Sequence, residues 1–245
     1  MYPHKSLVIH GAGRQFEKGE TLLKTKPHAD YPPEDGRYLR GNDNSPVAVA
    51  VILNKPDDQI PREIEELVRI GLESGAALSG TVQTENVGFE KIICNIVANP
   101  NIRYIVLTGP ESEGHLTGEA LKALLKNGVN EKKIIIGTDA PHPILYNLPL
   151  EFIERFRQQV SLIDLQFKGS RESVRQAVWS CYQEEPVKFE GYELCDIGAF
   201  PEPPLSGTIT QRVTEAWRLP QNEKEQKSVD KMWDLVNRLK KQQEK

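Results

Sequence analysis

Short apolar runs alternate with amphipathic segments through the middle of this 245-residue chain, and this alternation restricts the fold more than any other feature. The runs are rich in β-branched residues and bounded by polar or turn residues, as in strands buried on both faces. They lie at 46–53, 103–109, 133–137 and 160–166. Apolar residues recur at helical spacing in 61–73, 84–100, 117–128, 149–159 and 171–185. The pattern predicts an α/β fold: a Rossmann-like, doubly wound parallel sheet with helices on both faces.

Three regions of the chain follow from this pattern. Residues 35–185 hold the predicted Rossmann-like domain, residues 1–34 form an N-terminal extension, and residues 186–245 form a C-terminal extension. The latter contains a Pro-rich turn, FPEPPL (200–205), that we expect to be exposed. An amphipathic helix follows, whose apolar residues are Val229, Met232, Trp233, Val236 and Leu239. Packing on its own domain and a contact in a homo-oligomer both remain open for this helix.

Composition excludes several classes of protein. The formal net charge is −4 and Lys and Arg form no dense stripe, which argues against nucleic acid as the main partner. No apolar stretch reaches the roughly 18 residues of a transmembrane helix, and the first residues lack the pattern of a signal peptide. The three cysteines, Cys94, Cys181 and Cys195, have no metal-binding spacing. We therefore expect a cytoplasmic protein without a transmembrane segment.

The position of His115 makes it the first candidate for a functional residue. It follows the apolar run 103–109 in the sequence GPESEGHLTG and precedes the predicted helix 117–128. In parallel sheets, ligands bind outside the carboxyl ends of the strands. The loop after 133–137, which contains His142, lies at a second such place. From position alone, His115 can be a metal ligand, a catalytic base or a loop histidine.

Other constellations give weaker signals. Gly11 and Gly13 follow an apolar stretch as in a dinucleotide-binding site, but Phe16 occupies the third glycine position. A dinucleotide oxidoreductase is therefore a minor alternative. Ser112 lies near His115 without a nucleophile elbow, which disfavours a hydrolase. His142 and His115 lack a clear third ligand for zinc.

Three motifs carry a resemblance to a known family. They are GAALSG followed by TEN (75–86), ANPNIRY (98–104) and GHLTG (114–118), within the stretch 73–129. This stretch closely resembles the corrinoid-binding A subunit of tetrahydromethanopterin S-methyltransferase. The likeness continues through 35–53 and 131–165, so it is collinear and covers well over half of the chain.

The resemblance implies a corrinoid (cobamide) protein that carries methyl groups as a component of a methyltransferase. In such a carrier, Co(I) takes up the methyl group and methyl-Co(III) passes it to an acceptor. Partners would be methyltransferase proteins and, indirectly, a methylated pterin or another methyl donor. The resemblance makes His115 the axial cobalt ligand and implies no catalytic acid–base residue. The cofactor-binding residues would be Thr84, Glu85, Asn86, Gly109, Pro110, Gly114, His115, Leu116, Thr117, Gly118, Gly137, Pro141, Pro143 and Ile144.

Departures from the family pattern leave an alternative open. The chain ends in a charged amphipathic segment where the methanogen protein has an apolar anchor helix, and residues 54–72 read longer than the corresponding link. The alternative is a Rossmann-like binding or regulatory protein that has lost the cobamide and binds a nucleotide or a pterin. Gly114 and Gly118 likewise allow two interpretations. They let the loop approach a flat ligand and let His115 move, or they permit only a tight turn and close helix packing.

Overall fold

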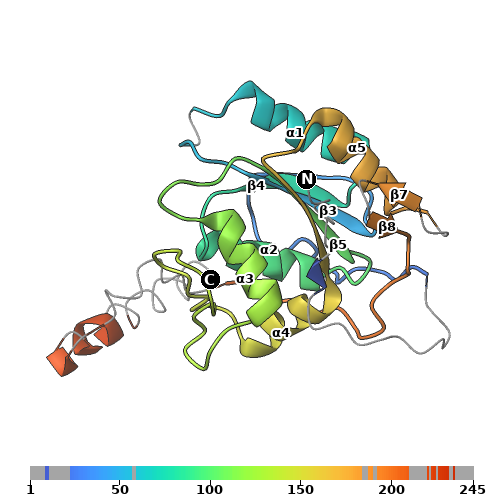
Figure 1. Ribbon diagram of the computed structural model, residues 1–245. Coiled ribbons are helices and arrows are strands. Elements are labelled where there is room, and N and C mark those ends of the chain that lie inside the picture. The colour runs from blue at the N-terminus through green and yellow to red at the C-terminus, as the bar shows by residue number, and fades with distance from the viewer. Residues whose placement is uncertain are drawn as a thin grey trace, which may run out of the picture. The chain divides into compact units, whose positions relative to one another are not determined.

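The computed structural model describes residues 9–10, 23–56, 59–183, 187–189, 192–209, 220, 222–224, 226–231 and 234. The chain divides into two compact units, residues 1–212 and 213–245, and the strands and helices labelled in Figure 1 belong to the first. In the second unit, residues 223–224, 226–231 and 234 are helical. Val229 is half-buried there, whereas Met232, Trp233, Val236 and Leu239 of the expected apolar face lie outside the described residues.

A six-stranded, mostly parallel sheet forms the centre of the first unit (Figure 1). Its parallel strands are β3 (Val47–Ile52), β4 (Leu78–Val82), β5 (Tyr104–Gly109) and β6 (Ser161–Gln166). Two short antiparallel strands flank them, β1 (Ile9–His10) on β6 and β2 (Tyr38–Arg40) on β4. The order is β1-β6-β5-β3-β4-β2. After β3 the chain adds β4 on one side of that strand and then β5 and β6 on the other, so the topological switch point lies between β3 and β5. The predicted parallel sheet is confirmed.

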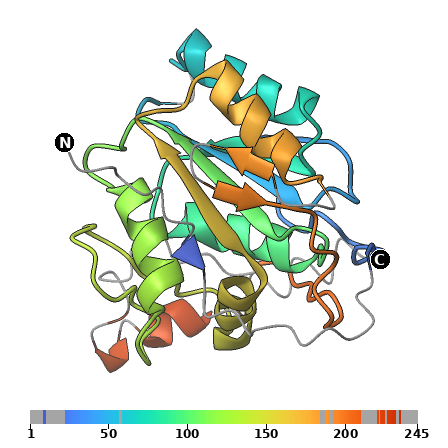
Figure 2. The same ribbon diagram turned by 45° about the vertical axis from the view of Figure 1, so that its right-hand side comes forward.

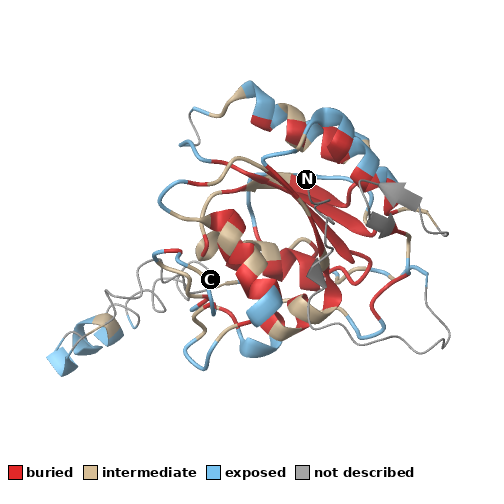
Figure 3. Ribbon diagram, in the orientation of Figure 1, coloured by how far each residue is buried: buried red, intermediate tan, exposed pale blue. Residues whose placement is uncertain are grey.

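Helices cover both faces of the sheet, as predicted. On one face lie α1 (Arg62–Glu73) and α5 (Arg171–Ser180), which run side by side in Figures 1 and 2. The other face carries α2 (Val87–Val97), α3 (Thr117–Asn127) and α4 (Leu150–Gln159). Alternate residues of β3 supply the two cores: Val49 packs with the first pair of helices and Ala50 with the second set. The buried strands between the two layers are red in Figure 3.

One predicted strand was wrong. KIIIG (133–137) is not a strand of the sheet; it makes single bridges from Ile134 to Ile144 and from Ile135 to Val129. Lys133 has φ 62° and Gly137 has φ 79°, and left-handed residues at both ends prevent an extended run from continuing. The segment 171–185 is also helical only as far as Ser180.

The chain after α5 is tied to the amino ends of the strands. It forms a hairpin of β7 (Val187–Phe189) and β8 (Tyr192–Leu194) and then reaches Phe200, which is 7% exposed. The ring of Phe200 lies 4.1 Å from the Arg155 guanidinium and 5.4 Å from that of Arg103. Burial lowers the pKa of both arginines to about 10, so both stay charged at neutral pH. In the turn at 200–205, Pro201, Glu202 and Pro203 are exposed as expected, whereas Phe200 at its start is a buried aromatic anchor.

In the part of the chain that the structure describes, no helix combines the length and apolar character needed to cross a membrane.

Candidate functional site

The carboxyl ends of β4 and β5 deliver the two loops that build the site. β5 ends at Gly109, whose φ of 99° turns the chain out of the sheet into the loop before α3. A Cβ at Gly109 would lie 2.8 Å from the carbonyl oxygen of Ile52 on the neighbouring strand. Glycine is therefore required here both by conformation and by space. Pro110 follows, and the loop continues to His115.

His115 pairs with Glu85, which comes from the connection between β4 and α2. Its Nδ1 lies 2.8 Å from Glu85 Oε2. The Glu85 side chain has no exposed area, whereas that of His115 is 41% exposed. An ionised carboxylate only accepts hydrogen bonds, so the pairing assigns the proton to Nδ1. In the tautomer with the proton on Nδ1, the lone pair lies on Nε2, where it can bind a metal or another electrophile.

The other Glu85 oxygen joins a second loop to this pair. Glu85 Oε1 accepts a hydrogen bond from the backbone N–H of His142 at 2.8 Å. Asn86 Nδ2 donates to the carbonyl oxygen of His142 at 3.4 Å. The loop 138–144 thus reaches the site through the backbone of His142, between Pro141 and Pro143. This arrangement fixes the carboxylate that orients His115.

The TEN segment has three separate roles. Glu85 orients His115, whereas Asn86 is the N-cap residue of α2 and its side chain accepts from the N–H of Val87. Thr84 Oγ1 accepts from the N–H of Gly88 at 3.0 Å. The helix runs from Val87 to Val97, so it begins three residues later and ends three residues earlier than the predicted range 84–100.

Two hydroxyl groups fasten the His115 loop to the β4–α2 connection. Ser112 Oγ and Thr117 Oγ1 both donate to the carbonyl oxygen of Gln83, at 3.1 and 2.7 Å. Leu116 lies between them with φ 48°, a left-handed conformation that is unusual for a branched side chain. Both ends of the loop are therefore held while its middle projects outward.

The two glycines of GHLTG differ in what requires them. Gly114 has φ 87°, and a Cβ there would meet nothing within 4 Å. Gly118 lies in the first turn of α3, and a Cβ there would come 2.3 Å from Nε2 of Gln166. Gly114 serves the backbone conformation of an open loop, whereas Gly118 serves close packing of α3 on the end of β6.

The remaining predicted residues are spread along α3. Gly137 lies at the carboxyl end of α3, where its Cβ would be 2.7 Å from Asn127 Nδ2. Asp139, which was not among the predicted residues, donates its N–H to Glu119 in the first turn of α3. Pro143 and Ile144 contact the 134–135 segment through backbone bonds.

Sequence reasoning missed Glu111 and Gln166 as parts of the site. The Glu111 carboxylate accepts hydrogen bonds from the N–H groups of Ser112, Gly118 and Glu119 and from Gln166 Nε2, at 2.8–3.2 Å. Burial alone would raise the pKa of Glu111, but these hydrogen bonds outweigh it and lower the pKa from its ordinary value. The only signal in the sequence was the position of both residues at the ends of predicted strands.

A cavity of about 360 Å³ opens beside the TEN segment. It lies between α2 and strands β3 and β4, with small residues such as Ala48, Ala50 and Gly80 in its lining. Thr84 and Gln83 line its end near the His115 loop, and Lys91 and Arg37 supply positive charge. The volume falls in the range of small-molecule sites.

Across the described residues, no three His, Cys, Asp or Glu side chains gather in a way that could hold a metal ion.

Comparison with known proteins places the chain in a family. Residues 24–196 match the family of the A subunit of tetrahydromethanopterin S-methyltransferase. The chain belongs to this family. The A subunit 1 of this enzyme from Methanobrevibacter ruminantium is 40% identical over 171 residues, which are 69% of this chain and 65% of the relative. The A subunit 2 from the same organism is 38% identical over 171 residues, 69% of this chain and 83% of the relative.

Another relative extends the match to a third protein of this family. The A subunit 2 from Methanothermobacter thermautotrophicus is 37% identical over 175 residues, covering 68% of this chain and 90% of the relative. The chain thus spans less than two thirds of the length of the first relative and most of the length of the other two, which are shorter forms. His115, Glu85 and Glu111 all lie inside the matched residues 24–196.

Proposed function

We propose that this protein binds a corrinoid (cobamide) and carries methyl groups for a methyltransferase system. The observation that carries the proposal is the His115–Glu85 pair, in which a fully buried carboxylate holds Nδ1 of a histidine whose side chain is 41% exposed. Metal-binding histidines commonly donate their other ring N–H to a carboxylate in this way. The pair supports His115 as an axial ligand of cobalt.

A single protein ligand fits this cofactor. A corrinoid would bring most of the cobalt ligands itself, so the protein would need to offer one further ligand and not a complete set. His115 provides one imidazole, and Glu85 together with the backbone of His142 fixes its orientation. When bound, the cofactor supplies a cobalt centre that accepts a methyl group and passes it on.

The loops around His115 suit a large, flat ligand. Gly114 carries no side chain into the open space above the loop, and the left-handed turn at Leu116 returns the backbone to α3. The cavity beside Thr84 offers apolar space to a further part of the ligand. In this proposal Pro110, Thr117 and the Pro141–Ile144 segment shape the rim and no side chain acts as a catalytic acid or base.

The donor and acceptor of the methyl group belong to partner proteins in this proposal. The relatives are named as components of tetrahydromethanopterin S-methyltransferase, so a methylated pterin is the donor that we propose, handled by a partner methyltransferase protein. The second candidate is a binding or regulatory protein without cobamide. The cavity favours it, because its apolar lining and positive rim also suit a nucleotide or a pterin.

An absorption spectrum tests the proposal directly. The full chain is incubated with hydroxocobalamin and desalted, as wild type, as His115→Ala and as His28→Ala. His28 is a control because its N–H bonds to Ala98, at the far end of α2 from the site. We expect retained corrin absorbance in the wild type and His28→Ala, with shifted bands or loss of colour in His115→Ala.

Other outcomes reject parts of the proposal. Identical bands in wild type and His115→Ala would remove the histidine as a cobalt ligand while keeping the carrier. A wild type that elutes colourless under both oxidising and reducing conditions would reject the carrier and favour the second candidate.

A further inference from the structure

The structure assigns to Glu111 the role of a positioning residue that holds the His115 loop in its binding conformation. This inference rests on the proposed function of His115. The loop leaves the sheet at Gly109 and enters α3 at Thr117, and Glu111 bonds to backbone groups at both of its ends. One carboxylate thereby closes the loop that presents the imidazole.

Glu111 replaces the missing cap of α3. The residue at the N-cap position is Leu116, which has no side-chain group that can accept a hydrogen bond. In an ordinary helix the N-cap side chain accepts from the second or third N–H of the helix. Here Glu111 Oε1 accepts from the N–H of Gly118 at 2.8 Å, and Oε2 accepts from that of Glu119 at 3.2 Å. Its negative charge also matches the positive end of the helix dipole.

The Glu111 carboxylate is also held by a residue of β6. Gln166 Nε2 donates to Glu111 Oε2 at 2.9 Å. Lys122 Nζ donates to Gln166 Oε1 at 2.8 Å, which sets the orientation of the amide. Gln166 is 4% exposed and packs directly beneath Gly118. Glu111 therefore has a defined rotamer, and its contacts come from three different elements.

The position of His115 depends on how far apart the two ends of its loop are held. Ser112 and Thr117 are both bound to the Gln83 carbonyl, which belongs to the same connection as Glu85. Glu111 bonds to the N–H of Ser112 and to the first turn of α3, so it sets the separation of these two anchors. Loss of its charge and of two acceptor positions would release the first turn of α3 and let the imidazole move away from Glu85.

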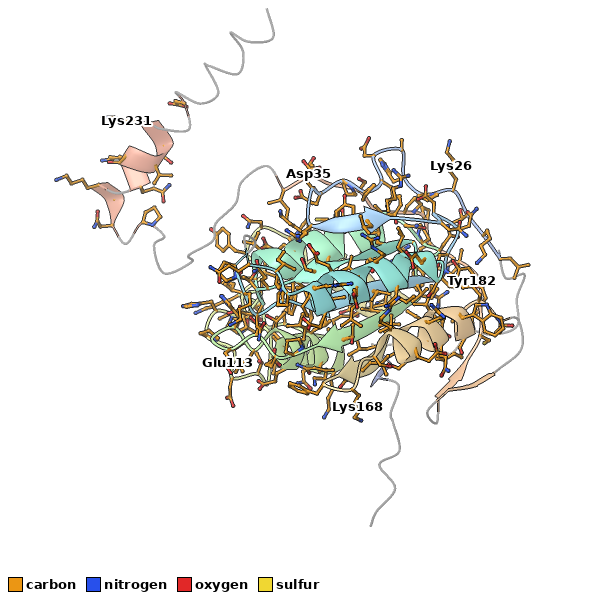
Figure 4. All side chains as sticks on the ribbon, turned by 90° about the horizontal axis from the view of Figure 1, so that it is seen from above. Lys26, Asp35, Glu113, Lys168, Tyr182 and Lys231 are labelled. Atoms are coloured by element: carbon orange, nitrogen blue, oxygen red, sulfur yellow. The ribbon has the colours of Figure 1, made fainter. Side chains whose placement is uncertain are left out.

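The test compares Glu111→Gln with Glu113→Gln in the full chain. The second variant removes the same charge two residues away, where Glu113 is exposed at the edge of the first unit (Figure 4). The first readout is the ¹⁵N spectrum of the His115 ring at fixed pH without cofactor, which reports the tautomer. The second is amide hydrogen exchange at Gly118 and Glu119.

We expect Glu111→Gln to lose the pure Nδ1–H tautomer and to speed exchange at Gly118 and Glu119 at least tenfold, while Glu113→Gln behaves as the wild type. Hydroxocobalamin affinity should fall about tenfold in Glu111→Gln, as for outer-shell partners of metal ligands. An unchanged tautomer with unchanged exchange in Glu111→Gln would overturn the inference.

A second variant and a measurement without cofactor keep the test conclusive. If Glu111→Gln fails to fold, Gln166→Met removes the hydrogen bond to Glu111 Oε2 and keeps the volume, and it should shift the tautomer in the same direction. A wild-type tautomer in Gln166→Met would then count against the inference. Because the ring spectrum is recorded without a corrinoid, failure of the wild type to bind hydroxocobalamin rejects the proposed function and not the positioning by Glu111.

Discussion

Glu85 and His115 come from two different strand–helix connections, and their side chains meet at 2.8 Å. Glu85 is fully buried although it carries a carboxylate, and its two oxygens accept from the His115 ring and from the backbone of His142. A buried ionisable group is tolerated only where hydrogen bonds replace its water. The pair therefore joins three loops at one edge of the sheet.

Glu85→Gln tests what the buried carboxylate does for His115. Glutamine keeps one acceptor oxygen and places an NH₂ group against either the imidazole or the N–H of His142. We expect the affinity for hydroxocobalamin to fall about 10- to 100-fold. The measurement is a spectroscopic titration, with Glu113→Gln as the control that loses an exposed carboxylate. Equal affinities in the two variants would contradict the role of Glu85.

Alanine at the two glycines of GHLTG should act through different causes. Gly118→Ala forces a methyl group against Gln166 and should lower the free energy of unfolding by about 1–3 kcal/mol. Gly114→Ala meets no neighbour but must adopt φ 87°, which costs about 1–2 kcal/mol.

A second substitution separates these causes in chemical denaturation experiments. Gln166→Ala removes the side chain that the new methyl group of Gly118→Ala would strike, so the cost of Gly118→Ala should shrink in that background. The cost of Gly114→Ala should stay the same. A Gly118→Ala cost that is independent of Gln166 would show that packing on β6 is not its origin.

Stability should depend on pH through Glu111. The folded protein lowers the pKa of this carboxyl below its ordinary value of 4.5, because its ionised form accepts four hydrogen bonds. Its contribution is fully present above the ordinary pKa and is lost as pH falls through the lower folded pKa. The difference in unfolding free energy between wild type and Glu111→Gln should therefore be constant near neutral pH and shrink below about pH 4.5. A difference that grows in acid would contradict this assignment.

The parallel strands β3, β5 and β6 could be predicted because strands buried on both faces read as apolar runs, whereas β4 was missed because its sequence, LSGTV, is interrupted by small and polar residues. β3 and β5 are continuous apolar runs, whereas the edge strand β2 has three residues, of which Leu39 and Arg40 are exposed. Such an edge gives no periodic signal. The segment 133–137 has the composition of a strand, but the left-handed residues Lys133 and Gly137 divert it, and single-residue conformations of this kind are set by tertiary contacts.

The site was predictable in part for a similar reason. His115 lies where the topology of a parallel sheet places ligands, and Glu85 was predicted from the family resemblance. Apart from their position at the ends of predicted strands, Glu111 and Gln166 could not be predicted, because their roles depend on contacts between β6, α3 and the loop. Hydrogen bonds across 55 residues of sequence leave no pattern that spacing can reveal.

Phe200→Ala tests the anchor of the C-terminal segment. The ring fills a place between Arg103 and Arg155, so its removal leaves a cavity beside two buried cations. We expect the free energy of unfolding of the full chain to fall by about 3–5 kcal/mol. Phe200→Leu retains most of the volume and should cost less than half of that value. A loss of no more than about 0.5 kcal/mol for the alanine variant, as at an exposed site, would show that the segment is held without this ring.

The carbonyl oxygen of Gln83 accepts hydrogen bonds from hydroxyl groups at both ends of the His115 loop, and this limits how the imidazole can move. With Ser112 and Thr117 fastened to one atom, displacement is confined to the four residues between them. A loop segment of this size moves on the nanosecond-to-microsecond timescale, which is faster than the closure of domains. The imidazole could then exchange between a position paired with Glu85 and a position away from it as fast as the carrier meets its partners. The sheet and α3 would not need to move.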